Sequence, residues 1–335
     1  MKLAQIFSDN MVIQANKPIR VFGQGEGVIT VEFNGNTKSS AAKDGKWLVV
    51  LDAMSYGGPY EMKISCDNED ITLKNVMVGE VILCAGQSNI EFTLGDEKYD
   101  VENIEENAKI RNFLINSPNP NLPSSELWNE CKKGKIGYWS AIGYHVAEIL
   151  NKKNDIAIGI IGLYQGTSAI QTFIDEKFFI EHPELDIPAE NVTKTVARKD
   201  KNCFWNEYGY MYHSMFEKLG NFSIGNVIWY QGESNSSPQE APIYKDLLKG
   251  LINMWRSDFE DEKLPFVIVQ ICYFTVRDDE FWKQIQKAQT DIQYEVENVV
   301  TVESTDCHEL HTNIHPASKI KLSEKLAGYI KLQNN

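Results

Sequence analysis

The alternation of hydrophobic and polar positions changes in character near residue 75 of the chain. Up to that point, short runs of alternating apolar and polar residues are separated by turn sequences containing Asn-Gly, Asp-Gly or Gly-Pro. Alternation indicates strands with one buried face, and Asn-Gly and Asp-Gly favour hairpin turns because these turns need positive φ. The runs are IRVFGQG, VITVEFNGN, KWLVVLDA, YEMKISC and DITLKN. Residues 1–75 are therefore expected to form a small antiparallel β-sandwich that serves as an accessory domain.

Residues 76–335 instead show continuous apolar runs that alternate with longer amphipathic segments. The apolar runs span 81–85, 110–115, 156–163, 226–230, 265–273 and 299–304, and the helical segments span 139–153, 211–220, 244–258, 279–294 and 318–333. Continuous apolar runs indicate strands that are buried on both faces. Their alternation with helices predicts an α/β domain built on a parallel sheet, with helices on both faces.

Four of the predicted strands end in residues that can carry chemistry. In parallel sheets the functional residues lie just beyond the carboxyl ends of the strands, so these positions are expected to meet. They are Ser88 after 81–85; Gly166 after 156–163; Gln231, Glu233 and Asn235 after 226–230; and Asp306, with His308, His311 and His315 in the next loop, after 299–304. A serine, two turns with amides and glycines, and a histidine cluster together favour a nucleophilic site.

Ser88 is the candidate nucleophile of this set. A serine hydroxyl is a weak nucleophile that needs a base within hydrogen-bond reach and donors for the developing oxyanion. His315, just before the final predicted helix, can supply the base, and Gly166 and Gln231 can supply donors beside the serine's own N–H. The alternative is that Ser88 is an ordinary turn or helix-capping residue. The Gly-x-Ser-x-Gly motif of α/β-hydrolases is absent, because Ile90 occupies its final glycine position.

The cysteines and histidines give little support for a metal site. The six cysteines form no Cys-x-x-Cys pair and no tight spacing, so neither a zinc knuckle nor a disulfide framework is expected. Residues 306–311 include a Cys/His tract, which is the metal-binding alternative to a nucleophilic site. Its spacing matches no standard zinc pattern. No metal or other cofactor is expected.

The net charge of the chain and its lack of long apolar runs restrict the kinds of partner that it can bind. A formal net charge of −14 argues against nucleic acid and anionic membrane surfaces. The N-terminal segment has Asp9 and Asn10 where a signal peptide needs an apolar stretch, and no run of about 18 apolar residues occurs. A soluble, cytoplasmic protein that binds a small molecule is expected.

The segment GQSNIEF at 86–92 resembles the GQSNMEF motif of the sialate O-acetylesterase family, within the wider group of SGNH hydrolases. Further segments resemble that family in the same order along nearly the whole chain. These are FSDNMVIQANKPIRVFGQGEG (7–27), GKWLVVL (45–51), GGPYEM (57–62), ITLKNVMVGEVILCAGQSN (71–89), IGIIGLYQGTSAIQTFI (158–174), NVIWYQGESN (226–235) and IHPASKIKLSEKLA (314–327).

The resemblance implies a flavodoxin-like SGNH domain that hydrolyses acetyl esters on sugars, with a small acetylated carbohydrate as substrate. Matched position by position, Ser88 would be the nucleophile and His315 the general base. Gly166 and Gln231 would be the oxyanion donors, and Glu233 and Asn235 would orient these groups or line the pocket. The last two roles follow only from their place in the motif NVIWYQGESN.

Two departures from the family pattern concern the acid behind the histidine. Many SGNH enzymes have an aspartate three residues before the histidine, where this chain has Thr312, and many relatives read Asp-Ile-His-Pro, where it has Asn313. Asp306 is the first candidate for the acid and Glu309 the second. A Ser–His dyad without an acid is the third possibility. In the second motif Gln165 replaces a glycine of the family, which would narrow or polarise the pocket.

The expected function is that of a serine esterase that removes O-acetyl groups from acetylated sugars by two-step acyl transfer. The alternatives are a non-catalytic carbohydrate-binding protein on a hydrolase fold, an acetylxylan-type esterase, and an esterase for lipid-like acyl chains. Aromatic residues are candidates for the walls of a sugar pocket, although aromatics also dominate ordinary cores. They are Trp205, Tyr208, Phe274 and Trp282.

Overall fold

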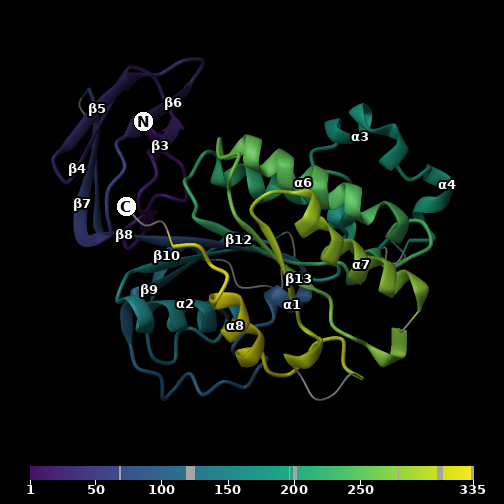
Figure 1. Cartoon of the computed structure of the whole chain (residues 1–335). Coiled ribbons are helices and arrows are strands. Elements are labelled where there is room, and N and C mark those ends of the chain that lie inside the picture. The colour runs from purple at the N-terminus through teal and green to yellow at the C-terminus, as the bar shows by residue number, and fades with distance from the viewer. Residues whose placement is uncertain are drawn as a thin grey trace.

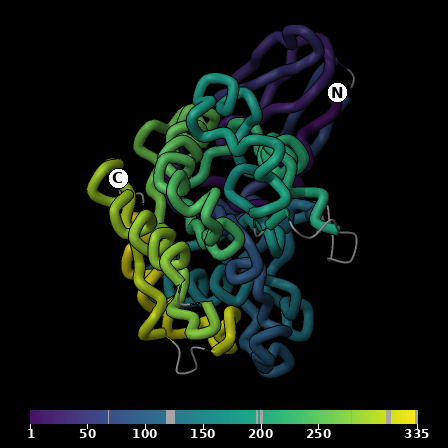
Figure 2. The backbone as a smooth tube through the Cα atoms, turned by 90° about the vertical axis from the view of Figure 1, so that its right-hand side faces the viewer, coloured from purple at the N-terminus to yellow at the C-terminus, as the bar shows by residue number. Residues whose placement is uncertain are grey.

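The computed structural model describes residues 1–67, 69–117, 125–195, 197–198, 202–277, 279–307 and 312–332. It contains an N-terminal β-region, purple in Figure 1, beside a larger α/β region. The α/β class expected from the sequence is confirmed. Figure 2, seen from the end opposite the β-region, has the coiled segments of the α/β region in front and the N-terminal strands behind and above them.

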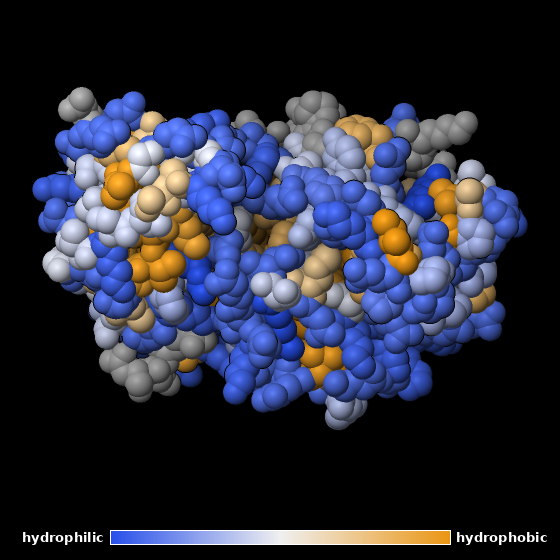
Figure 3. All heavy atoms as spheres, turned by 90° about the horizontal axis from the view of Figure 1, so that it is seen from above, coloured by the Kyte–Doolittle hydropathy of each residue, from blue (hydrophilic) through white to orange (hydrophobic). Residues whose placement is uncertain are grey.

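The N-terminal strands form two small sheets. One is antiparallel and consists of β1 (Lys2–Leu3), β3 (Ile19–Gln24) and β6 (Lys46–Leu51). The other consists of β2 (Val12–Gln14), β4 (Val28–Phe33), β5 (Asn36–Ala41), β7 (Gly57–Cys66) and the first half of β8 (Glu69–Gly86). In β6 every second residue is buried, as the alternating sequence KWLVVL predicts. On the face seen in Figure 3, hydrophobic side chains gather at the left, over this β-region.

One long strand, β8, connects the β-region with the α/β region. Its first half pairs antiparallel with β7, and residues 80–86 pair in parallel with β11 and β12. The domain boundary predicted between residues 75 and 76 therefore falls inside a continuous strand. The strand is partly exposed up to Asn75 and is buried from Val76 to Gly86, which explains the change in hydrophobic pattern at this point.

The central sheet has the strand order β10-β9-β11-β8-β12-β13-β14. Its strands besides β8 are β9 (Asn107–Leu114), β10 (Ser125–Cys131), β11 (Ile158–Tyr164), β12 (Asn226–Tyr230), β13 (Phe266–Gln270) and β14 (Val299–Glu303). The pairs between β9 and β14 in this order are parallel, whereas β10 is antiparallel to β9 at the edge. The chain order reverses at β8, because later strands lie on both sides of it. Such a switch point is where ligands bind in open α/β sheets.

Helices cover both faces of the central sheet. In Figure 1, α2 (Ala141–Asn154) and α8 (Ile320–Ala327) lie on one face, and α6 (Tyr244–Asp258) and α7 (Glu280–Glu295) lie on the other. The shorter helices are α1 (Ser88–Glu91), α3 (Lys177–Glu181), α4 (Ala189–Val192) and α5 (Tyr210–Ser214). Ser140 and Asp279 cap the N-termini of α2 and α7, each accepting a hydrogen bond from a backbone N–H three residues ahead. No helix in the described ranges is long and apolar enough to cross a membrane.

Candidate active site

The serine of the GQSN motif lies at the carboxyl end of β8, where the strand order reverses. Gly86 ends β8 with a φ of +136°, and a Cβ there would lie 2.1 Å from the carbonyl oxygen of Tyr230. Only glycine fits this close approach between β8 and β12. Gln87 then turns the chain, and Ser88 is the first residue of α1. The local backbone thus places Ser88 at the carboxyl edge of the sheet, at the end of its central strand β8.

The structure brings Ser88 and His315 together. The Nε2 atom of His315, in the segment before α8, lies 2.8 Å from the Oγ atom of Ser88. This is the distance expected between a nucleophile and its base. Burial lowers the pKa of His315, the positive charge of Lys319 lowers it further, and Asp96 acts in the opposite direction. The imidazole is therefore neutral at pH 7 and is able to accept a proton.

A buried polar network holds the backbone next to His315. The Nδ2 group of Asn89 donates to the carbonyl oxygen of Ile314 at 3.0 Å and to Oε1 of Glu233 at 2.7 Å. Its Oδ1 atom accepts a hydrogen bond of 2.7 Å from Nζ of Lys319. Because Asn89 is adjacent to Ser88 and Ile314 is adjacent to His315, this amide couples the two reacting residues.

The two charged members of this network are both buried. Burial raises the pKa of Glu233, while the Asn89 hydrogen bond and the charge of Lys319 oppose the shift. Burial lowers the pKa of Lys319 to about 8. Glu233 thus accepts a hydrogen bond from Asn89, the neighbour of Ser88, and its orienting or pocket-lining role stays a prediction. Sequence reasoning missed Asn89 and Lys319, although both belong to the motifs GQSNIEF and IHPASK.

The side chain of Asp306, the first candidate for the acid, contacts groups other than His315. Its carboxylate pairs with Nζ of Lys325 on α8, and its side chain is 63% exposed. The hydrogen bond from Lys325 lowers the pKa of Asp306. Among the described residues, nothing joins Asp306 to His315, so its role as the acid gains no support from a contact. Glu309, the second candidate, and His308 and His311 lie outside the described residues.

The carboxylate whose charge does act on His315 is Asp96, in the loop after α1. Its Oδ2 atom accepts hydrogen bonds from the backbone N–H and the hydroxyl of Thr93, at 2.9 Å and 2.8 Å. Asp96 is exposed and influences the imidazole through space. Sequence reasoning missed it because it follows Ser88 closely, whereas the search for an acid concentrated on the residues around His315.

Gly166 lies beside the nucleophile, as predicted. A Cβ built on Gly166 would lie 3.6 Å from the Cβ atom of Ser88 and 2.9 Å from Oε2 of Glu91. The backbone of Gly166 interacts with the carboxyl group of Glu91 and lowers its pKa, against the larger effect of burial. Gly166 therefore lies close to Ser88, with an acidic side chain from α1 beside it, and its role as an oxyanion donor stays a prediction.

The side-chain amide of Gln231 is committed to other acceptors. Its Nε2 group donates to the carbonyl oxygen of Ser168 at 2.9 Å, to Oδ1 of Asn235 at 2.7 Å and to Oε1 of Gln87 at 3.2 Å. Its Oε1 atom accepts from the Tyr244 hydroxyl at 3.0 Å. Gln231 is fully buried. In this arrangement both N–H groups are used, so Gln231 and Asn235 join the strand ends together rather than face Ser88.

The predicted aromatic wall residues mainly pack against other side chains. Trp282 is fully buried and its indole N–H donates to the carbonyl oxygen of Cys272 at 2.9 Å. Phe274 packs against Trp282, and Tyr208 stacks on Phe179. These contacts match the core-packing alternative. All six cysteines are buried thiols outside disulfide bonds.

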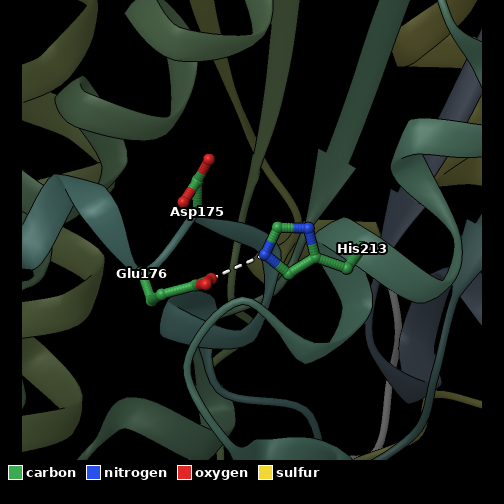
Figure 4. A group of neighbouring side chains, drawn as sticks. All are labelled: Asp175, Glu176 and His213. Carbon is green, nitrogen blue, oxygen red and sulfur yellow. Dashed lines mark hydrogen bonds and ion pairs between the residues drawn. The ribbon is translucent and has the colours of Figure 1, made fainter.

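One group in the described residues has the composition of a metal site, namely Asp175, Glu176 and His213 (Figure 4). The Nε2 atom of His213 lies 2.6 Å from Oε2 of Glu176, and its Nδ1 atom lies 3.2 Å from Oε1 of Glu217. Burial lowers the pKa of His213, but the hydrogen bonds to the two glutamates outweigh burial and the net shift is upward. Both ring nitrogens are thus occupied by carboxylates, so an ion pair of a protonated imidazole accounts for the cluster.

A cavity of about 710 Å³ lies between the β-region and residues 217–221, and Phe22 and Trp47 are among its lining residues. It contains neither Ser88 nor His315. The assignment of the site therefore depends on the contact between these two residues and on their neighbours, and not on the size of a cavity.

An α/β sheet that carries a Ser–His pair at its switch point is an arrangement found in serine hydrolases. Residues 78–331 match the family model described as carbohydrate esterase, sialic acid-specific acetylesterase. The chain belongs to this family, and the resemblance seen in the sequence is confirmed.

Relatives from other organisms agree with this assignment. The chain is 26% identical over 308 residues to the sialate O-acetylesterases of Homo sapiens and Pongo abelii, an alignment that covers 81% of this chain and 57% of each relative. The chain thus spans less than two thirds of the length of these curated relatives. A crystal structure of a carbohydrate acetylesterase from Xanthomonas citri superposes with a TM-score of 0.83 at 27% identity, covering 98% of this chain and 74% of that one.

Proposed function

We propose that this protein is a serine carbohydrate esterase that removes O-acetyl groups from acetylated sugars. The 2.8 Å contact between Ser88 Oγ and His315 Nε2 at the switch point of the sheet is the observation that carries the proposal. The family match supports the substrate class, because the relatives are named for acetyl esters of sialic acid and other carbohydrates. The proposal includes an SGNH-type, flavodoxin-like domain, preceded by a β-sandwich as an accessory domain.

The first half of the reaction forms an acetyl-enzyme. Ser88 Oγ attacks the acetyl carbonyl carbon while His315 Nε2 takes the hydroxyl proton. The electron pair of the carbonyl moves to its oxygen, where the N–H groups of Ser88 and Gly166 stabilise the negative charge. The C–O bond to the sugar then breaks, and the sugar oxygen leaves with the proton from His315.

The second half releases acetate. Water attacks the acetyl carbon of the ester on Ser88, and His315 takes a proton from that water. Collapse of the second oxyanion returns this proton to Ser88 Oγ and frees the acetate. Each half uses the same neutral imidazole, which agrees with the lowered pKa of His315.

The test compares the wild type with Ser88→Ala in acetate release from a panel of acetylated sugars, including O-acetyl sialic acids and acetylated xylo-oligosaccharides. Loss of release with an unchanged circular dichroism spectrum supports the proposal, and near-wild-type turnover contradicts it. A fluorophosphonate probe should label the wild type at Ser88 and leave the variant unlabelled. Sugar binding without labelling or acetate release would indicate a carbohydrate-binding protein instead.

A further inference from the structure

Glu91 is an acidic residue next to the reacting pair that the mechanism above does not use. It is three residues after Ser88, at the end of the four-residue helix α1. Its Oε2 atom lies 2.9 Å from the position that a Cβ on Gly166 would occupy, and the Cβ atom of Ser88 lies 3.6 Å from the same position. The carboxyl group and the nucleophile therefore flank Gly166 together.

The contact of Glu91 with Gly166 conflicts with a simple oxyanion hole. The carboxyl group of Glu91 lies against the backbone of Gly166 and interacts with it, although the Gly166 N–H is needed for the acetyl oxygen. An ionised carboxylate in this place would also repel the negative charge that develops on that oxygen. A neutral carboxylic acid would have the opposite effect, because its O–H is a donor. The protonation state of Glu91 thus decides whether the site helps or opposes the reaction.

The groups around Glu91 favour its neutral form. Burial raises the pKa of Glu91 to about 7, and the negative charge of Asp96 raises it as well, against the effect of the Gly166 hydrogen bond. The charge of Glu91 acts on the buried Tyr164 of β11, and no lysine or arginine in the described ranges forms an ion pair with Glu91. On the far side of Ser88 lie His315 and Lys319, whose ammonium group is held by Asn89. Glu91 is half-buried, and burial without a paired cation favours the protonated form of a carboxylic acid.

We propose that Glu91 is a catalytic residue of this esterase, which donates a hydrogen bond to the developing oxyanion as a neutral acid and blocks the Gly166 N–H as a carboxylate. No proton is transferred from Glu91 in this step, so Ser88 and His315 keep the roles given above. The inference depends on the proposed function, because it assigns a donor to the same acyl transfer. It also supplies a side-chain donor in place of the amide of Gln231, which is occupied by other acceptors.

The test is the pH dependence of kcat/KM for acetate release, compared between the wild type and Glu91→Gln. In the wild type kcat/KM should rise as His315 loses its proton and fall again through a pH of about 7, where Glu91 ionises. The amide that replaces the carboxyl group in the variant keeps a donor but cannot ionise. The alkaline decline should therefore disappear, and at pH 9 the variant should exceed the wild type by about tenfold or more.

Two further variants make the result specific. Glu91→Leu removes the donor at every pH, so its kcat/KM should be low and without an alkaline decline. Glu105→Gln is the matched control, because Glu105 is an exposed glutamate of the same loop region and its replacement should leave the wild-type profile unchanged. An unchanged circular dichroism spectrum shows that the fold of each variant is intact.

The inference is overturned if the wild type shows no alkaline decline near pH 7, or if Glu91→Gln keeps the same decline as the wild type. Failure of the proposed function would look different, because either the wild type would release no acetate or Ser88→Ala would retain acetate release. An inactive Ser88→Ala together with identical profiles for the wild type and Glu91→Gln would reject the role of Glu91 alone.

Discussion

The turns that follow β11 and β12 look alike in sequence but have different tasks in the structure. Both combine glutamine and glycine directly after a buried strand, as YQGTS at 164–168 and YQGES at 230–234. After β11, Gly166 presents its backbone to Ser88 and Glu91. After β12, Gln231 is fully buried and its amide joins three strand-end segments. The turn after β11 lies beside Ser88, and the turn after β12 holds it in place through hydrogen bonds.

This difference shows how a buried amide network can serve a reactive site without touching it. Asn235 donates to Oε1 of Gln171 at 2.8 Å and accepts from the backbone N–H of Ile170 at 2.9 Å. These contacts anchor the segment that follows Gly166. Because buried polar groups are costly when unpaired, the network also fixes one arrangement of the strand ends. The predictions below separate the reacting groups from the supporting ones.

The largest effect is expected at the reacting pair itself. His315→Ala removes the group that accepts the Ser88 proton, so kcat for acetate release should fall by roughly 10²–10⁴-fold with the fold retained. His213→Ala is the control, because this histidine belongs to the ion-paired cluster of Figure 4 and has no contact with Ser88 among the described residues. A kcat for His315→Ala within tenfold of the wild type would remove the imidazole from the mechanism.

Gln231→Ala should act mainly on stability. The change leaves the buried Ser168 carbonyl without its donor and removes one hydrogen bond each from Asn235 and Gln87, which keep backbone N–H donors. A cost of about 2–3 kcal/mol in the free energy of unfolding is expected. Urea unfolding measures this cost, with Gln24→Ala at the exposed end of β3 as the control. If kcat instead falls by 10²–10³-fold with unchanged stability, Gln231 is an oxyanion donor after all and the comparison of the two turns is wrong.

The sequence predicts the elements of the α/β region well because its strands are continuous apolar runs. The predicted segments at 226–230 and 244–258 coincide with β12 and α6. The predicted helix at 318–333 shortens to Ile320–Ala327, because the pattern does not mark where the helix ends. The edge strand β10 was missed, since its sequence SELWNEC is largely polar.

For the site, sequence reasoning found the residues that carry recognisable chemistry, namely Ser88, His315 and Gly166. It could not tell that Gln231 is occupied, because the acceptors Ser168 and Gln87 come from other strand ends and only the fold brings them together. It also missed Glu91, whose importance depends on its distance from Gly166 and not on its own motif. Hydrogen-bond partners across strand ends are set by the three-dimensional packing and leave no local pattern.

A smaller effect on kcat/KM is expected when the charges around His315 change. The direction in which the pH profile moves tests the arrangement of these charges. In the proposed mechanism the imidazole of His315 must be neutral, so kcat/KM should rise with pH through the pKa of His315. Lys319 lowers this pKa, so Lys319→Met should move the rise to higher pH. Asp96 raises it, so Asp96→Asn should move the rise to lower pH. Shifts in the same direction for both variants would contradict the electrostatic arrangement of the site.

The smallest effect on kcat is expected from a change at Asp306. This change tests whether Asp306 is the carboxylate that assists His315. Its carboxylate pairs with Lys325 on the exposed side of α8, and exposed ion pairs contribute little. Asp306→Asn should therefore keep kcat for acetate release within about twofold of the wild type, with an unchanged pH profile, because no contact in the described structure carries its charge to His315. If kcat instead falls by several orders of magnitude, Asp306 must reach the imidazole during the reaction, and the Ser–His pair acts as a triad. An unchanged kcat leaves Asp96 as the described carboxylate that acts on His315, and it does so through space rather than through a hydrogen bond.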